Sequence, residues 1–143
     1  MPLTGHCNCK AVTITVDDSK YTTESESSLK SIYCHCTTCK RQSGASGTFV
    51  IIADDNEVKI DDPKGAMKSW KDTLTDSGTP LDRNFCGICG CPLTTITPLY
   101  AGKTIVKMGL FDTIPPAAME IYCKNKQKWE PDVAGVNQVH GSP

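Results

Sequence analysis

The chain has 143 residues, the length of one domain with a single hydrophobic core, so we expect one domain over residues 1–143. Apolar residues make up 38% and charged residues 22% of the sequence, and the formal net charge is -1, as in an ordinary soluble globular protein. This balance does not favour a nucleic-acid or membrane partner, and no apolar run approaches the roughly 20 residues of a membrane span.

Short apolar or alternating runs predict strands along most of the chain. Residues 11–16 alternate, with Val12, Ile14 and Val16 on one face, which is typical of a half-buried strand. The run TFVIIA at residues 48–53 is almost wholly apolar and predicts a strand buried on both faces. Further strands are expected at residues 29–33, 57–60, 66–70, 81–85, 93–97, 104–108 and 118–122.

Polar segments with many turn-forming residues separate these strands. Residues 17–28 are rich in Ser, Thr and Glu and predict a loop, and residues 37–47 predict a turn with one short helical turn at 39–43. The tail from residue 124 is expected to be mostly irregular. No stretch keeps a helical period over ten or more residues, so the pattern as a whole predicts a mainly β domain.

Cysteine usage is the most distinctive feature of the composition, with nine cysteines in the chain. The first residues have neither the basic nor the apolar region of a secretory signal, which predicts a cytoplasmic protein whose thiols stay reduced. Clustered cysteines in a reducing compartment favour metal binding. A disulfide framework is the alternative, and it would leave one thiol spare because the count is odd.

Seven of the cysteines fall into three short motifs, which divide into a set of four and a set of three. The set of four combines a C-x-C with a C-x-x-C and consists of Cys7, Cys9, Cys86 and Cys89. Residues two apart in an extended chain point to the same side, and a tight turn does the same for C-x-x-C. Four thiolates close a tetrahedral zinc site, so we expect this set to bind a structural zinc that contributes to folding.

The set of three is local and consists of Cys34, Cys36 and Cys39. Three protein ligands leave one zinc position open for water or a substrate. A thiol bound to zinc is deprotonated near neutral pH, so such a site suits making or breaking a bond between a thiol and an electrophilic carbon. The alternative is a second closed, purely structural site, completed by His35, His6 or Cys91.

The combined pattern resembles the glutathione-dependent formaldehyde-activating enzyme family. The three matching segments are Gly5-x-Cys7-x-Cys9, Tyr33-Cys34-His35-Cys36-x-x-Cys39-x-Arg41-x-x-Gly44 and Phe85-Cys86-x-x-Cys89-Gly90-x-Pro92-Leu93. The resemblance implies an Mss4-like fold of small antiparallel sheets and two zinc ions, a structural one on the set of four and a catalytic one on the set of three. It also implies the condensation of formaldehyde with glutathione to S-hydroxymethylglutathione, a carbon–sulfur lyase reaction.

The sequence departs from the family pattern in two places and leaves other functions open. Lys10 stands where glycine is usual, and Cys91 stands where serine or threonine is common. One alternative is a different lyase or dehydratase step on a biosynthetic intermediate, and the other is a non-catalytic zinc-binding interaction module. Arg41 is the candidate that would bind a substrate carboxylate such as that of glutathione, or else pair with a thiolate or a surface carboxylate.

Overall fold

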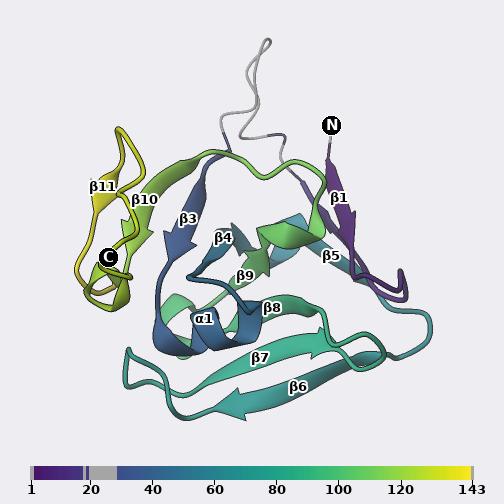
Figure 1. The fold of residues 1–143 in the computed structure, drawn as a ribbon. Coiled ribbons are helices and arrows are strands. Elements are labelled where there is room, and N and C mark those ends of the chain that lie inside the picture. Colours follow the sequence, from purple (N-terminus) through teal and green to yellow (C-terminus); the bar gives the residue numbers. More distant parts are fainter. Residues whose placement is uncertain (1, 18, 20–28, 143) are drawn as a thin grey trace.

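The computed structural model describes residues 2–17, 19 and 29–142, and it contains two β sheets (Figure 1). The smaller sheet is antiparallel, in the order β1-β2-β5. Its strands are β1 (Leu3–His6), β2 (Thr13–Val16) and β5 (Val58–Asp61). Val12, Ile14 and Val16 are fully buried, as the alternation in this segment predicts.

The larger sheet has eight strands in the order β11-β10-β3-β4-β9-β8-β7-β6. Its strands are β3 (Ser31–Cys34), β4 (Thr48–Asp54), β6 (Met67–Asp72), β7 (Leu81–Cys86), β8 (Pro92–Ile96), β9 (Lys103–Lys107), β10 (Ala117–Ile121) and β11 (Asn137–Gln138). It is antiparallel from β3 to β6, whereas β10 pairs in parallel with both β3 and β11. The prediction of a mainly β fold is confirmed.

The described residues form one α-helix, α1 (Thr37–Ser43), which lies where the larger sheet bends around it (Figure 1). Its sequence has no sustained apolar period, and it is held by its ends: the Cys36 sulfur accepts from the Cys39 amide, and Gly44 ends the helix in the left-handed conformation. Short 3₁₀ segments that lie wholly within the described residues are η2 (Asp55–Glu57), η3 (Pro98–Tyr100), η4 (Met108–Leu110) and η5 (Cys123–Asn125).

The predicted strands all overlap observed strands, and their ends differ by at most two residues. Strands β1 and β11 were not expected, and the helical turn predicted at 39–43 is part of the longer α1. The loop predicted at 17–28 lies outside the described residues, apart from residues 17 and 19. The tail is mostly irregular, as predicted.

The main core lies between the two sheets, and a second apolar cluster lies under α1. Strand β4 contributes to both: Ile51 and Ala53 belong to the main core, while Val50 faces the opposite side of the sheet toward α1. The second cluster consists of Cys34, Cys36, Cys39, Ile121 and Tyr122. The expectation that residues 48–53 are buried on both faces is therefore confirmed for these three residues.

A close contact at Gly5 fixes where β1 meets the rest of the chain. A Cβ atom at residue 5 would lie 2.5 Å from the Leu110 carbonyl oxygen, so only glycine allows this approach. The contact places the turn that follows β1, which carries Cys7 and Cys9, next to the larger sheet.

Within the described residues, no helix is long and apolar enough to cross a membrane.

Candidate metal sites and the adjoining pocket

The four cysteines of the first set come together between the two sheets. Cys7 and Cys9 lie in the turn after β1, and Cys86 and Cys89 lie at the end of β7 and in the turn that follows it. Their four sulfur atoms all lie within 4.8 Å of one another. The Cys7–Cys9 and Cys9–Cys86 sulfur separations are 3.6 and 3.7 Å, close to the ~3.8 Å edge of a tetrahedron with 2.3 Å zinc–sulfur bonds. This donor set fits zinc.

Two tight turns bring these sulfurs together. In the first, Lys10 adopts a left-handed conformation at φ 64° and its amide donates to the Cys7 carbonyl. This is the position where the family that the sequence resembles usually has glycine, and a lysine in this conformation costs about 1 kcal/mol of stability. In the second, Gly90 has φ 77° and its amide donates to the Cys86 carbonyl over 2.7 Å.

Backbone amides also point at the sulfurs, but their effect differs between the cysteines. At Cys9 the Ala11 amide lowers the pKa, whereas burial and contacts with the other three sulfurs raise it overall to about 11. The Val12 amide donates to the Cys7 sulfur over 3.5 Å. Hydrogen bonds from the amides of Cys9 and Cys91 to the Cys89 sulfur lower the pKa of that thiol to about 6. Because a metal binds thiolates, this turn is suited to holding a cation.

The second set of three cysteines lies at the junction of β3 and α1. Cys34 ends β3, Cys36 caps α1 and Cys39 lies in its first turn, and all three side chains are buried. The sulfur of Cys34 lies 3.7 Å from that of Cys39, and the three sulfurs form a group that could hold a metal ion. Among the described residues, no His, Cys, Asp or Glu joins this group as a fourth donor.

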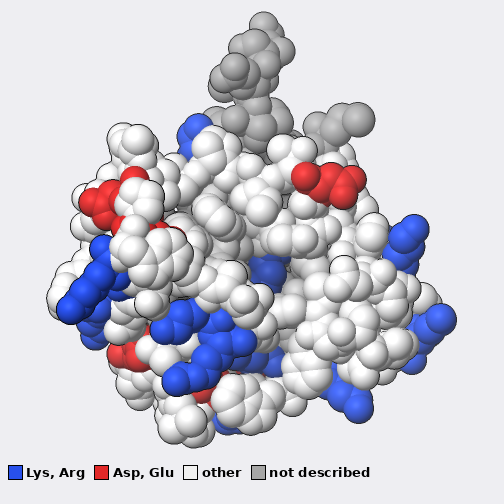
Figure 2. All heavy atoms as spheres, in the orientation of Figure 1, with Lys and Arg blue, Asp and Glu red and all other residues white. Residues whose placement is uncertain are grey.

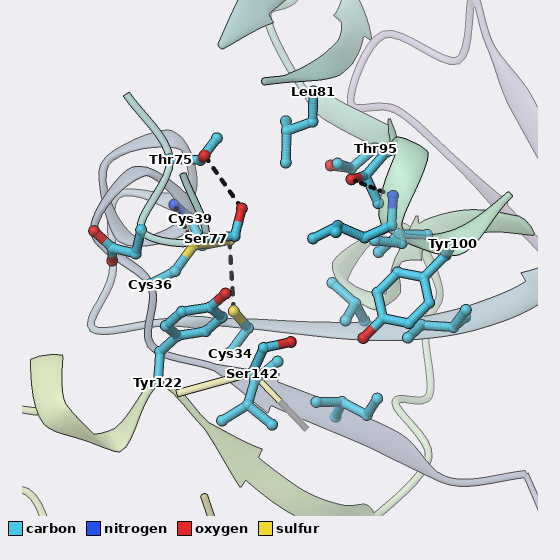
Figure 3. A pocket seen from close by; sticks show the side chains of 18 of the residues that line it. Cys34, Cys36, Cys39, Thr75, Ser77, Leu81, Thr95, Tyr100, Tyr122 and Ser142 are labelled. Carbon is cyan, nitrogen blue, oxygen red and sulfur yellow. Dashed lines mark hydrogen bonds between the residues drawn. A yellow bond between two sulfur atoms is a disulfide. The ribbon is translucent and has the colours of Figure 1, made fainter. Parts of the chain in front are cut away.

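Cys36 and Cys39 are joined by a disulfide in this structure (Figure 3). For this pair the structure has the disulfide alternative, although both sulfurs also belong to the group that could hold a metal ion. The other described cysteines are free. A metal needs both sulfurs as thiolates, so the disulfide and the metal site are alternative states of the same residues. Only the reduced form presents three sulfur donors.

A pocket with a volume of about 90 Å³ adjoins the three cysteines on the inner face of the larger sheet. Figure 3 shows the cysteines on one side of it and Thr95 and Tyr100 on the other. Most of its wall is apolar and comes from alternate positions of β3, β4 and β9 and from flanking segments: Ile32, Val50, Ile52, Leu81, Leu99, Ile105 and Ile121. The site is thus open to a small molecule on the side that carries sulfur.

Two buried cations line the same pocket, and sequence reasoning missed both. Arg83 donates to Asp72 over 2.7 Å and to Thr38 over 2.6 Å, and its guanidinium also lies 3.8 Å from the Cys39 sulfur. Lys107, on β9, is 5% exposed. Burial raises the pKa of Cys34, and the positive charges of Lys107 and Arg83 oppose this rise. The sequence feature that could have revealed Arg83 is the alternation of β7, which places Arg83 on the same face as Leu81.

Arg41, the residue expected to bind a substrate carboxylate, lies on the exposed side of α1. It lines a surface groove with Trp70 and Phe85 and is absent from the wall of the pocket at the cysteines. Figure 2 shows Lys and Arg side chains gathered on the face over α1. The role of Arg41 stays a prediction.

His35 turns away from the sulfurs and is fully buried. Its Nε2 atom lies 3.0 Å from a Glu120 carboxylate oxygen on β10. Burial alone would raise the pKa of Glu120, but hydrogen bonds from Gln138, His35 and the Val133 amide bring it down to about 2. This network links the C-terminal segment to the residue that follows β3. His35 therefore supports the cysteines from behind and is not part of the three-sulfur group.

Comparisons with known proteins concern the family and the fold of the chain. The family model described as glutathione-dependent formaldehyde-activating enzyme matches residues 2–125. Among solved structures, the chain is similar to the crystal structure of a Rhodobacter sphaeroides protein, with a TM-score of 0.58 and 15% identity, over 95% of this chain and 99% of that chain. At this identity the likeness concerns the fold alone. No curated protein matches the chain.

Proposed function

This chain belongs to the glutathione-dependent formaldehyde-activating enzyme family, with its mainly β, Mss4-like fold, and from that premise we propose that it is a zinc-dependent carbon–sulfur lyase. The enzyme would join or cleave a thiol, glutathione or a similar one, and an aldehyde or another electrophilic carbon. We take it to be a single-domain, cytoplasmic protein. The observation that carries the proposal is the contrast between the two sulfur sets: one has four donors, and the other has three donors beside a pocket.

The residues divide into two metal sites. We propose that Cys7, Cys9, Cys86 and Cys89 hold a structural zinc, and that reduced Cys34, Cys36 and Cys39 hold a catalytic zinc. When bound there, zinc would supply the positive charge that keeps a thiol substrate deprotonated. The buried setting of the three cysteines would strengthen this charge effect because little water screens it.

The reaction needs no oxidant or reductant. The thiol loses its proton to solvent, its sulfur forms a bond to the carbonyl carbon, the carbon–oxygen π bond breaks, and the oxygen takes up one proton. Arg83 would favour the thiolate state of Cys39, since Asp72 and Thr38 hold its guanidinium against that sulfur. The apolar walls would exclude water from the reacting carbon.

Arg41 remains our candidate for binding a carboxylate of glutathione. Glutathione is a charged tripeptide, too large for the pocket, so most of it would lie on the surface outside. The Lys and Arg side chains over α1 provide a positive face there (Figure 2). A guanidinium matches a carboxylate with two parallel hydrogen bonds.

The second candidate function is a non-catalytic zinc-binding interaction module. It is favoured by exposed apolar side chains near α1: Trp70 is 49% exposed and Leu74 is 74% exposed. Both line the groove that contains Arg41. This function would need only the structural zinc, so it leaves the three-cysteine set without a purpose.

Metal removal tests the proposed activity. Reduced, zinc-loaded protein is expected to accelerate the exchange between formaldehyde, glutathione and their adduct, measured by NMR exchange spectroscopy. A mild chelator should remove the zinc of the three-cysteine site and return the exchange to the uncatalysed rate, and added zinc should restore it. Circular dichroism on the same samples controls for unfolding. If acceleration persists after the second zinc is lost, the three-cysteine site is not where the reaction occurs.

A further inference from the structure

The pocket wall includes polar side chains that the proposed reaction has not used, and two of them, Lys107 and Thr95, lie on neighbouring strands. Lys107 is 5% exposed and Thr95 is 3% exposed. Within the described residues, the Thr95 hydroxyl is buried without a hydrogen-bond partner. A buried hydroxyl left unpaired is unfavourable, so a pocket that retains one is suited to a ligand that pairs with it.

These two side chains lie on neighbouring strands and on the same face of the sheet. Thr95 on β8 is paired with Ile105 on β9, and Lys107 is two residues further along β9. Such diagonal neighbours on one face are within reach of each other's side chains when one of them is long. One oxygen atom of a ligand can therefore contact both the ammonium and the hydroxyl.

The other cation of the pocket is already engaged. Arg83 is the cross-strand partner of Thr95, but its donors go to Asp72, Thr38, Gln42 and the Cys39 sulfur. Lys107 is therefore the cation best placed to serve a ligand. Lys107 and Cys34 line the same pocket.

The rest of the wall indicates what the ligand carries besides its oxygen. The surface that the wall presents is mostly apolar, although Thr75, Asp76, Ser77, Thr97 and Ser142 and the rings of Tyr100 and Tyr122 also line it. A volume of about 90 Å³ is several times the space that one water needs, and formaldehyde would leave most of it empty. Hydrocarbon groups gain from filling such space, by about fourfold in binding for each methylene.

We propose that this pocket binds an aldehyde that carries a hydrocarbon group, with the carbonyl oxygen on the Lys107 ammonium and the Thr95 hydroxyl. The inference rests on the proposed function and names its substrate class. Thr95 lies across the pocket from the cysteines (Figure 3), which leaves room between them for the thiol sulfur and the carbonyl carbon.

Lys107 would act on the oxygen as the new bond forms. The thiolate sulfur bonds to the carbonyl carbon, the π electrons move to the oxygen, and the Lys107 ammonium gives this oxygen its proton. The proton that the thiol released to solvent then returns to Lys107, so the sum is addition of a thiol to an aldehyde. Burial, aided by the nearby charge of Arg83, lowers the pKa of Lys107 to about 8, which suits a proton donor at neutral pH.

A substrate series tests the size of the aldehyde. With reduced, zinc-loaded protein and glutathione, kcat/KM is expected to rise by about fourfold for each methylene from acetaldehyde through propanal to butanal, whose carbonyl groups have similar intrinsic reactivity. A series that is flat, or that falls from acetaldehyde onward, would overturn the proposal while leaving the carbon–sulfur chemistry intact.

Variants test the two polar residues. Lys107→Met keeps the length of the side chain and should lower kcat/KM for butanal by about 100-fold or more. Thr95→Val keeps the shape of the side chain and should lower kcat/KM for butanal by about tenfold. Lys103→Met is the matched control, because Lys103 is on the same strand outside this pocket, and it should leave the rate unchanged. If Lys107→Met matches this control, or if it acts by losing the second zinc, the proposal is wrong.

A binding measurement separates this proposal from the proposed function. Isobutyramide has an aldehyde-like carbonyl oxygen on a branched hydrocarbon but does not react with thiols. Saturation-transfer NMR should detect its binding to the zinc-loaded protein and to Lys103→Met, and should show a loss of binding in Lys107→Met and Thr95→Val. Binding with this pattern supports the pocket assignment even if no aldehyde turns over. Absence of binding, or equal binding to all four proteins, contradicts it.

Discussion

A Cys86→Ser protein is expected to lose one zinc ion and its cooperative thermal unfolding transition. Cys86 is fully buried, and its sulfur lies 3.7 Å from that of Cys9, which is 77 residues away in the sequence. The site thereby ties the turn after β1 to the end of β7. Structural zinc contributes about 10–16 kcal/mol to folding in small zinc domains, whereas the whole stability of a domain is about 5–15 kcal/mol. Loss of this site should therefore leave little net stability.

The measurement is thermal unfolding by circular dichroism, with zinc determined on the same protein. Cys91→Ser is the matched control, since Cys91 lies in the same turn but outside the four-sulfur group. It should keep its zinc and unfold cooperatively near the temperature of the unsubstituted protein. A Cys86→Ser protein that unfolds as cooperatively and as late as the control would show that the four sulfurs do not hold the fold together.

A Cys36→Ser protein is expected to keep its fold but to lose the second zinc and its turnover. Cys36 lies at the start of α1, in the smaller apolar cluster, and its loss leaves only two sulfur donors, Cys34 and Cys39. Neutral serine is a poor zinc ligand because its hydroxyl stays protonated at pH 7. Without the metal charge the reaction should fall to the uncatalysed rate, a loss of at least about 100-fold.

The assay for Cys36→Ser uses reduced protein, so that the Cys36–Cys39 disulfide of the unsubstituted protein does not bias the comparison. Cys123→Ser is the control, because Cys123 belongs to neither sulfur group. Turnover by Cys36→Ser at the control rate would rule out the three-cysteine site as the catalytic centre. Loss of turnover together with loss of the fold would instead assign this set to structure.

The strands and the two sulfur groups could be predicted because their signals are local. Alternation such as that of Val12, Ile14 and Val16 depends only on which face is buried, and C-x-C or C-x-x-C spacing depends only on a bend or a turn. The four-residue β1 and two-residue β11 carry too little pattern to be seen, and their pairing depends on partners distant in the sequence.

The rest of the site depends on sheet order, which the sequence does not state. Lys107 reaches the pocket because β9 lies between β4 and β8, and Arg83 reaches Cys39 because α1 crosses the inner face toward β7. His35 finds Glu120 85 residues later through the parallel pairing of β3 with β10. Arg41, which was expected to bind a carboxylate because of its guanidinium group, instead lies on the exposed side of the helix.

The most direct test is the zinc content per chain, by elemental analysis of protein purified under reducing conditions without added metal and measured again after mild chelation. We predict two zinc ions per chain before chelation and one after it, because a closed four-sulfur site should retain its metal while an open three-sulfur site should release it. A single zinc ion that resists chelation, in protein whose Cys36 and Cys39 are shown to be reduced, would contradict the assignment of a second, catalytic metal site.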